Sequence, residues 1–305
     1  MANTYTTNDI FENVKLLSHM PEGNATFTEA NVITLADREL QTALIKQILS
    51  VREGYYLTYE DFDVNSTGEY AIPSKAIGGA LYNIEILQNS TVIQVNRIEP
   101  QEQFSTLYPT SYAYGFYIKG NTIKIMPVPP VGDPRIWYLR RPNKLVATSA
   151  CGQITAVSGA DITVSSLPST FLVGTSVDLA QDQPTFNILG TREITAINSL
   201  TVTLDSAVTD LAVGDWLCLE NQTPVPQIPV EFRPLLEQRV VVKVYELQGY
   251  LPKMQAAQAK LKELEKDLFD LITPRTQAAG KIIMPVNGGF MTPSSTRIYP
   301  APRVV

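Results

Sequence analysis

The sequence has few of the residues on which most enzyme sites depend. Its 305 residues include one histidine, His19, and two cysteines, Cys151 and Cys218. A single histidine excludes a histidine-rich metal site, and any Ser-His-Asp or Cys-His triad would have to use it. His19 lies where a short helix should end, so we interpret it as a polar helix-end residue. The cysteines have neither metal nor redox spacing, and we expect reduced thiols in a cytosolic product.

Long apolar runs and charged residues are also scarce. No run approaches 18 apolar residues, so we predict no membrane span. The start, Met-Ala-Asn-Thr, has no basic or apolar leader region, and we expect no signal peptide. Only 18% of the residues are charged, while 44% are hydrophobic. A surface so poor in charge suggests that other proteins cover much of it.

Acidic residues are absent from one whole segment, residues 274–305. That segment contains Arg275, Lys281, Arg297 and Arg303, a formal charge of +4 within a chain of net −6. The rest of the chain therefore carries −10, which argues against non-specific nucleic-acid binding by the body. The segment also contains prolines, glycines and scattered aromatic residues. We predict an extended C-terminal arm that becomes ordered on a partner.

A duplication dominates the middle of the chain. Residues 154–179 recur as residues 194–219 at a spacing of 40, and eight of the 26 aligned positions are identical. Each copy should supply about three strands. A three-stranded unit has open edges, and its duplicate can cover them. We predict a small closed barrel or sandwich. Arg141-Pro142 precedes this unit and the Pro224–Pro229 stretch follows it, which marks residues 143–228 as an inserted β-domain.

Helical patterns flank the insertion, so the predicted fold class is α+β. Apolar spacing predicts a helix from Thr7 with Ile10, Val14 and Leu17 on one side, and a longer one from Thr28 to before Gly54. Residues 231–248 and 252–272 form two more. The last has a seam for an antiparallel bundle, made of Met254, Ala257, Leu261, Leu264, Leu268 and Leu271. Strands are expected at 91–95, 115–119, 122–126 and 135–140, and more loosely at 55–64. The predicted parts are residues 1–142 and 229–273 (the core), 143–228 (the β-domain) and 274–305 (the arm).

Three patterns resemble chemical sites but have simpler explanations. Gly78-Gly79 lacks the lysine and the context of a phosphate loop, and close packing of the backbone explains it. Glu60, Asp61 and Asp63 alternate with aromatic residues, as on a half-exposed strand. The charged run at 262–267 is the solvated face of the last helix. We therefore predict that the protein is not an enzyme and needs no cofactor or metal.

The order of short motifs along the chain resembles the head-to-tail adaptor (connector) proteins of short-tailed bacteriophages. The motifs that carry the resemblance are Thr26-Phe27-Thr28, Leu35-Ala36-Asp37, Ser50-Val51-Arg52-Glu53, Tyr70 through Gly79, Arg141-Pro142, Gly214-Asp215, Ile228-Pro229 and Pro274-Arg275. They span nearly the whole chain.

This resemblance implies a virion protein that forms a ring, commonly of twelve subunits, between the portal and the downstream tail. A helical bundle would build the ring wall, and the arm would dock on the portal. Genomic DNA would pass through the channel without sequence-specific binding, and assembly would occur in the host cytoplasm. The expected portal-interface residues are Arg275, Lys281, Phe290, Arg297, Tyr299 and Arg303. Tail nozzle, tail tube or fibre proteins are further expected partners.

A second hypothesis makes the duplicated β-domain a carbohydrate-binding module for host attachment. Such modules usually present exposed aromatic side chains, and the duplicated region offers only Phe171, Phe186 and Trp216.

Overall fold

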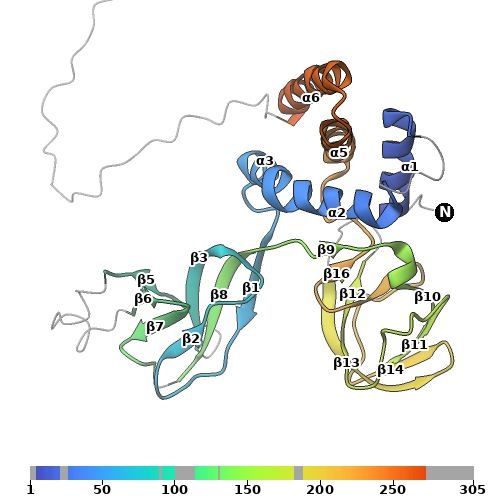
Figure 1. Ribbon diagram of the computed structural model, residues 1–305. Helices are drawn as coiled ribbons and strands as arrows, with labels where there is room; N and C mark the ends of the chain where they lie inside the picture. The colour runs from blue at the N-terminus through green and yellow to red at the C-terminus, as the bar shows by residue number, and fades with distance from the viewer. Residues whose placement is uncertain are drawn as a thin grey trace, which may run out of the picture.

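A computed structural model describes residues 5–20, 27–88, 91–99, 114–129, 131–181 and 188–272. The fold is α+β: a layer of helices lies above two separate β-lobes, as Figure 1 shows. The chain begins in the helices, builds the first lobe, enters the second through a short junction, and returns to the helices. None of the helices in the described ranges combines the length and apolar character that a membrane crossing requires.

The helical layer is formed by the two ends of the described chain. Its elements are α1 (Thr7–Ser18), α2 (Glu29–Glu39), a π-helical turn (Leu40–Leu44), α3 (Ile45–Val51), α5 (Arg233–Gln248) and α6 (Leu251–Ile272). A 3-10 turn, Val230–Phe232, leads into α5. The predicted helix from Thr28 is thus confirmed, with Thr28 as its N-cap and the π turn in its middle.

The core of this layer joins α1, the α2–α3 helix and α5. Ile10, Val14, Leu40, Ile48 and Phe232 are fully buried within it. The first helix starts at Thr7, and Thr6 and Asp9, rather than Thr7, form its capping box. The expectation that Leu17 faces the core is wrong, because the side chain is 45% exposed. Ser18 is buried there instead, and its hydroxyl donates to the carbonyl of Val14.

The first lobe, the sandwich lobe, consists of two four-stranded sheets that share one core. One sheet has the order β1 (Leu57–Asp61), β8 (Asp133–Arg140), β3 (Ala76–Gln88) and β4 (Thr91–Gln94). The other has the order β2 (Glu69–Ala71), β7 (Thr122–Met126), β6 (Gly115–Lys119) and β5 (Asn96–Arg97). Ile84, Ile123 and Ile136 are fully buried between the sheets. The predicted hairpin at Gly120-Asn121 joins β6 to β7.

The long strand β3 was not predicted, and Gly78-Gly79 explains the omission. Both glycines have positive φ, 58° and 70°, and they interrupt the pairing with β8 between Ala76 and Leu81. A Cβ atom added at either glycine would meet nothing within 4 Å. The interpretation that these glycines allow close packing is therefore wrong. They provide a left-handed backbone at a bulge, which glycine adopts without steric cost.

The second lobe is a closed six-stranded barrel built from the two copies. The first copy contributes β10 (Gly152–Ser158), β11 (Asp161–Val164) and β12 (Ser176–Ala180). The second contributes β13 (Ile188–Asn198), β14 (Thr201–Leu204) and β15 (Trp216–Leu219). The strands close in the order β10-β11-β14-β13-β12-β15, so exchanging the copies leaves the order unchanged. The barrel therefore has an internal two-fold pseudosymmetry, and of the two predicted forms, closed barrel or sandwich, the structure has the closed barrel.

Hydrogen bonds repeat between the copies at the same spacing of 40. Ile154 N donates to Asp215 O at 2.8 Å, and Ile194 N donates to Thr175 O at 3.0 Å. The Thr155 hydroxyl donates to Thr163 O, and the Thr195 hydroxyl to Thr203 O, at 3.1 and 3.0 Å. A bulge follows Ile154 and its equivalent Ile194. Each copy thus closes against the other through the same contacts.

One equivalent pair of turn residues tests this pseudosymmetry. Gly159 and Ser199 both have positive φ, 64° and 56°, although only glycine adopts that conformation without strain. We expect Ser199→Gly to stabilise the protein by about 0.5–1 kcal/mol, and Gly159→Ser to destabilise it by about 1 kcal/mol. Denaturant unfolding of both variants measures this. If both substitutions changed the free energy of unfolding in the same direction, the two turns would not be equivalent.

Candidate interaction surface and the junction that orients it

The barrel is connected to the rest of the chain by two adjacent segments, which we call the junction (residues 142–151 and 221–229). β9 (Lys144–Leu145) pairs in parallel with β16 (Gln222–Thr223), and a 3-10 turn (Thr148–Ala150) leads into β10. The entering and leaving segments therefore lie side by side, as expected of an insertion. The position of β9 and β16 directly below the helices is visible in Figure 1.

Asp178 is the polar centre of the junction. Its side chain is fully buried on β12, at the outer surface of the barrel wall. Its carboxylate accepts hydrogen bonds from Asn143 Nδ2 (2.7 Å), Thr191 Oγ1 (2.6 Å) and Asn221 N (2.9 Å). Lys75 Nζ, at the start of β3 in the sandwich lobe, lies 3.6 Å from it. One carboxylate thus joins both junction segments, the barrel and the sandwich lobe.

Alignment of the two copies contains a signal for this site that sequence reasoning missed. Asp178 is the equivalent of Cys218, and the two residues pair directly across β12 and β15. One copy has an acidic residue where the other has an apolar one. This difference indicates that Asp178 has a role in contacts outside the barrel rather than in the barrel itself. Asp178 was not among the predicted site residues.

The helical layer holds the junction from above. Asp37 Oδ1 accepts from Leu145 N at 2.9 Å, and Gln41 Nε2, in the π-helical turn, donates to Pro142 O at 2.9 Å. From α1, Thr7 N donates to Pro224 O at 2.8 Å. These bonds satisfy junction backbone groups that no sheet would pair, and they fix the barrel below the helices.

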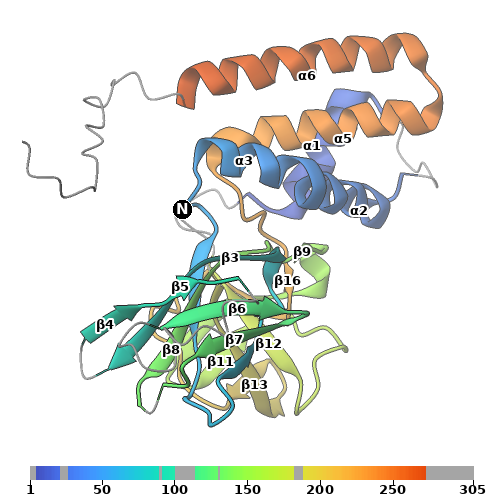
Figure 2. The same cartoon turned by 90° about the vertical axis from the view of Figure 1, so that its left-hand side faces the viewer.

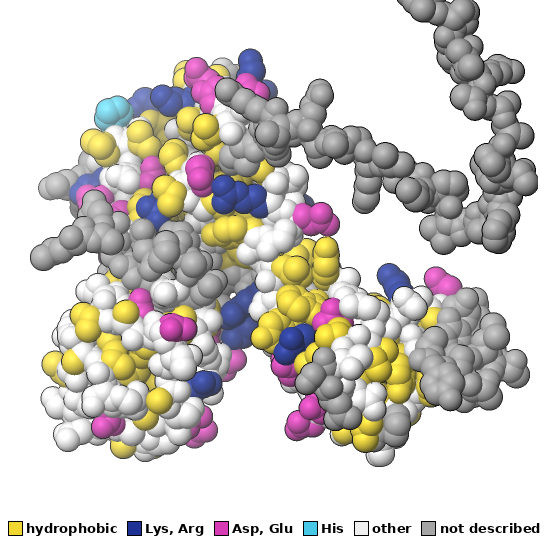
Figure 3. Space-filling view, turned by 180° about the vertical axis from the view of Figure 1, so that it is seen from behind, with side chains coloured by type: hydrophobic (Ala, Val, Ile, Leu, Met, Phe, Trp, Pro, Cys, Tyr) yellow, Lys and Arg dark blue, Asp and Glu magenta, His cyan; other side chains and the backbone are white. Residues whose placement is uncertain are grey.

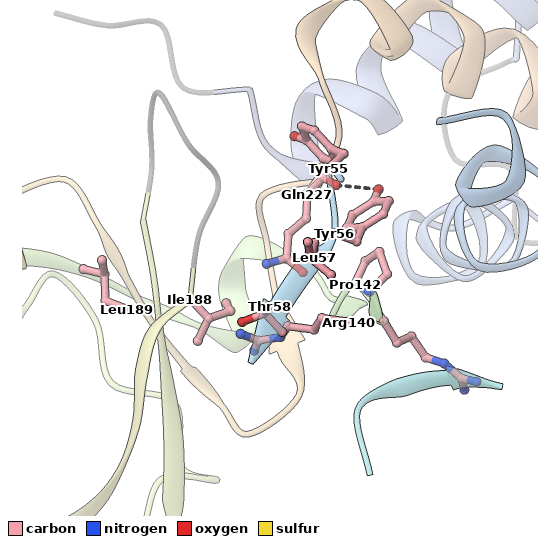
Figure 4. Close-up of a pocket in the computed structure, with 10 residues that line it drawn as sticks. Tyr55, Tyr56, Leu57, Thr58, Arg140, Pro142, Ile188, Leu189 and Gln227 are labelled. Atoms are coloured by element: carbon pink, nitrogen blue, oxygen red, sulfur yellow. Dashed lines mark hydrogen bonds between the residues drawn. The ribbon is translucent and has the colours of Figure 1, made fainter. Parts of the chain in front are cut away.

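The two β-lobes are separated by an open groove, which Figure 3 shows from behind. A cavity of about 410 Å³ lies at its upper end, lined by Tyr55, Tyr56, Leu57, Thr58, Arg140, Arg141, Pro142, Ile188, Leu189 and Gln227. Figure 4 shows the Tyr56 hydroxyl donating to Gln227 O at 2.9 Å across this space. Burial raises the pKa of Tyr56, so its hydroxyl stays a proton donor. The cavity walls thus come from strands of both lobes and from the segments that connect them.

The outer helical surface is a candidate for contact with other proteins. α6 runs back along α5 at the edge of the molecule farthest from the lobes (Figure 2). Of the predicted seam, Ala257 and Leu268 are buried and Met254, Leu261 and Leu264 half-buried, whereas Leu271 is 71% exposed. The prediction that Leu271 belongs to the packed seam is therefore wrong. Further exposed apolar residues on this surface are Leu247, Tyr250, Leu251 and Phe269.

A charged bridge fixes the position of α6. Arg239 on α5 lies between two acids, 3.6 Å from Glu39 of α2 and 2.5 Å from Glu265 of α6. Gln47 Nε2 of α3 also donates to Glu265 at 2.8 Å. Glu265 belongs to the run 262–267, whose other charged residues are exposed as predicted. These contacts place the end of α6, at Ile272, over α3 (Figure 2).

The predicted portal-interface residues are not tested by the structure. Arg275, Lys281, Phe290, Arg297, Tyr299 and Arg303 all lie outside the described residues.

His19 is the C-cap of α1 with φ of 50°, as the helix-end interpretation predicts. In the part of the chain that the structure describes, no three His, Cys, Asp or Glu side chains gather as metal ligands would. Of the predicted acidic trio, Glu60 and Asp61 lie on β1 and Asp63 lies beyond its end; Asp61 pairs with Arg135, whose hydrogen bonds lower the carboxyl pKa.

Comparison of the chain with protein-family models and with curated proteins finds no match. The fold and the surfaces described above therefore carry the functional argument.

Removing the charge of Asp178 should loosen the junction. We expect Asp178→Asn to lower the free energy of unfolding by about 2–4 kcal/mol, because Lys75 loses its counter-charge and one acceptor becomes a donor. Trypsin cleavage after Lys144 should accelerate at least tenfold, since β9 would open more often.

Asp161→Asn is the matched control, because Asp161 is an exposed barrel acid that accepts from Thr203 at 2.6 Å. It should change stability by less than about 1 kcal/mol and leave the cleavage rate unchanged. Equal cleavage rates in the Asp178 and Asp161 variants would contradict the role given to Asp178.

Proposed function

We propose that this chain is a head-to-tail adaptor of a tailed bacteriophage. Its subunits form a ring, dodecameric in the resembling family, between the portal and the downstream tail. The helical layer forms the ring wall, and residues 274–305 dock on the portal. The protein acts by assembly rather than catalysis, and it resides at the head-tail junction of the virion after assembly in the host cytoplasm.

The exposed apolar residues at the two ends of α6 are the observation that carries this proposal. Leu247, Tyr250 and Leu251 are 64%, 54% and 61% exposed at the α5–α6 turn, and Leu271 is 71% exposed near the other end. Large apolar side chains grouped on a surface mark protein contacts more often than scattered single ones do. α6 is also long, about 33 Å at 1.5 Å per residue, so it offers a neighbour an extended edge.

The charge distribution supports the same proposal. Residues 274–305 follow directly on α6 and carry +4, whereas the remaining chain carries −10. A basic segment attached to an acidic body suits an anchor on an acidic partner surface. An acidic body also suits a channel wall, because it repels DNA phosphates and lets the duplex slide.

The carbohydrate-binding alternative gains no support from the barrel. Phe171 and Trp216 are only 3% and 8% exposed, and Phe186 lies outside the described residues. The barrel residues that the structure describes thus present no exposed aromatic ring for a sugar to stack on. In this proposal the barrel contacts a tail neighbour or decorates the rim of the ring.

Binding to the portal tests the assignment of the arm. A chain truncated after Arg275 should keep the far-ultraviolet circular dichroism and Tm of the full chain, because the helical core ends before it. We expect this chain to lose at least tenfold in co-sedimentation with portal rings from the same phage genome. If it binds as well as the full chain, the arm assignment is wrong.

The helical surface is tested in the same assay with Leu247→Gln/Leu251→Gln. Val213→Gln is its matched control, because Val213 is 68% exposed on the barrel. The double variant should bind portal but form incomplete rings, whereas the control should form complete ones. Failure of the unaltered full chain to bind portal would contradict the adaptor proposal itself.

A further inference from the structure

The barrel is closed by an unusually short pairing between its first and last strands. β10 and β15 pair in register at Gly152–Leu217 and Gln153–Trp216, and the bond from Ile154 N to Asp215 O continues this pairing by one residue. The pseudosymmetric pairing, β12 with β13, extends from Ser176–Glu193 to Ala180–Ile188. The β10–β15 pairing is therefore the weakest closure of the barrel, and it lies where the chain enters from the junction.

The register of this pairing places the two cysteines directly opposite one another. One step beyond Gly152–Leu217 the facing residues are Cys151 and Cys218, and Cys151 continues the extended backbone with φ −124° and ψ 163°. Ile154 N donates to Asp215 O, which makes that pair hydrogen-bonded. Alternation along the ladder then makes Cys151–Cys218 a non-hydrogen-bonded pair, the kind with the closer Cα atoms, about 4.5 Å apart. That separation lies within the range that a disulfide spans.

The equivalent position at the other closure already carries a cross-strand bond. Subtracting 40 from Thr191 gives Cys151, and adding 40 to Asp178 gives Cys218. Thr191 and Asp178 face each other in the register and are hydrogen-bonded at 2.6 Å. Both thiols are buried with Ala180, Trp216 and Val225 under the junction, and they are hydrogen-bonded to each other.

We propose that Cys151 and Cys218 form a reversible disulfide that covalently closes the barrel at its β10–β15 pairing. The inference rests on the register and burial of the two residues and is independent of the proposed function. It departs from the expectation of reduced thiols.

The oxidant in this proposal is a low-molecular-weight disulfide. One cysteine thiolate attacks it, forming a mixed disulfide and releasing one small thiol. The second cysteine thiolate then attacks the protein sulfur of that mixed disulfide and releases the other small thiol. In balance, two protein thiols become one disulfide, and the two electrons and two protons reduce the oxidant to two small thiols.

Burial determines when this step occurs. It raises the pKa of Cys218, so the thiol stays protonated and unreactive in the closed barrel. Oxidation therefore proceeds during folding or when the short β10–β15 pairing opens. Once formed under the junction, the disulfide is shielded from reductants until the pairing opens again.

The test uses the unaltered full chain, unfolded and then refolded in oxidised glutathione or in dithiothreitol. Refolding in oxidised glutathione should yield protein that lacks the mass of two hydrogen atoms, resists alkylation after denaturation, and gives one linked peptide containing Cys151 and Cys218. Its Tm should exceed that of the reduced protein by roughly 5–10 °C, because the bond constrains a long loop of the unfolded chain. Dithiothreitol should abolish the difference.

Cys151→Ser and Cys218→Ser are the matched controls, and each should show the same Tm after oxidising and reducing treatment. Two alkylatable thiols after oxidative refolding of the unaltered chain would overturn the proposal. So would glutathione adducts without the internal link, links between chains, or an internal link that leaves the Tm unchanged.

Discussion

A fully buried carboxylate is stable only where other groups replace the water that it has lost. Asp178 meets this condition by accepting from Asn143, Thr191 and Asn221 and by facing Lys75. These partners come from both junction segments, the adjoining barrel strand and the sandwich lobe. Breaking any one contact leaves the charge less compensated, so the parts of the molecule keep one arrangement. The helices then hold the junction through Asp37 and Gln41.

The duplication explains why one face of the barrel can hold the buried carboxylate of Asp178. Two copies of a three-stranded unit close on each other through repeated hydrogen bonds, and symmetry would give both outer faces the same residues. The chain instead carries Asp178 and Thr191 at one closure and Cys218 and Cys151 at the equivalent one. The first pair fixes the barrel to its neighbours, and the second faces the junction where the barrel is weakest. The barrel is thus symmetric in backbone and asymmetric in the residues that connect it.

Much of this architecture is predictable from local patterns. The spacing of 40 predicts a duplicated closed barrel or sandwich, and the apolar periodicity predicts the helices to within a few residues. β3 was missed because Gly78-Gly79 breaks the strand pattern at a bulge that only pairing with β8 stabilises. Leu17 and Leu271 fit a helical stripe but are exposed, because none of the described elements covers that side. Asp178 was missed because its partners are distant in sequence, and only comparing the copies position by position reveals it.

We propose that the helical layer and the basic segment after it build a ring on a portal. Native mass spectrometry of the full chain, alone and mixed with portal rings from the same phage genome, tests it most directly. The account predicts one complex whose added mass is a fixed whole-number multiple of the 33.7 kDa subunit. Unchanged masses of both proteins after mixing would contradict it, as would a graded series of complexes with no preferred number of subunits.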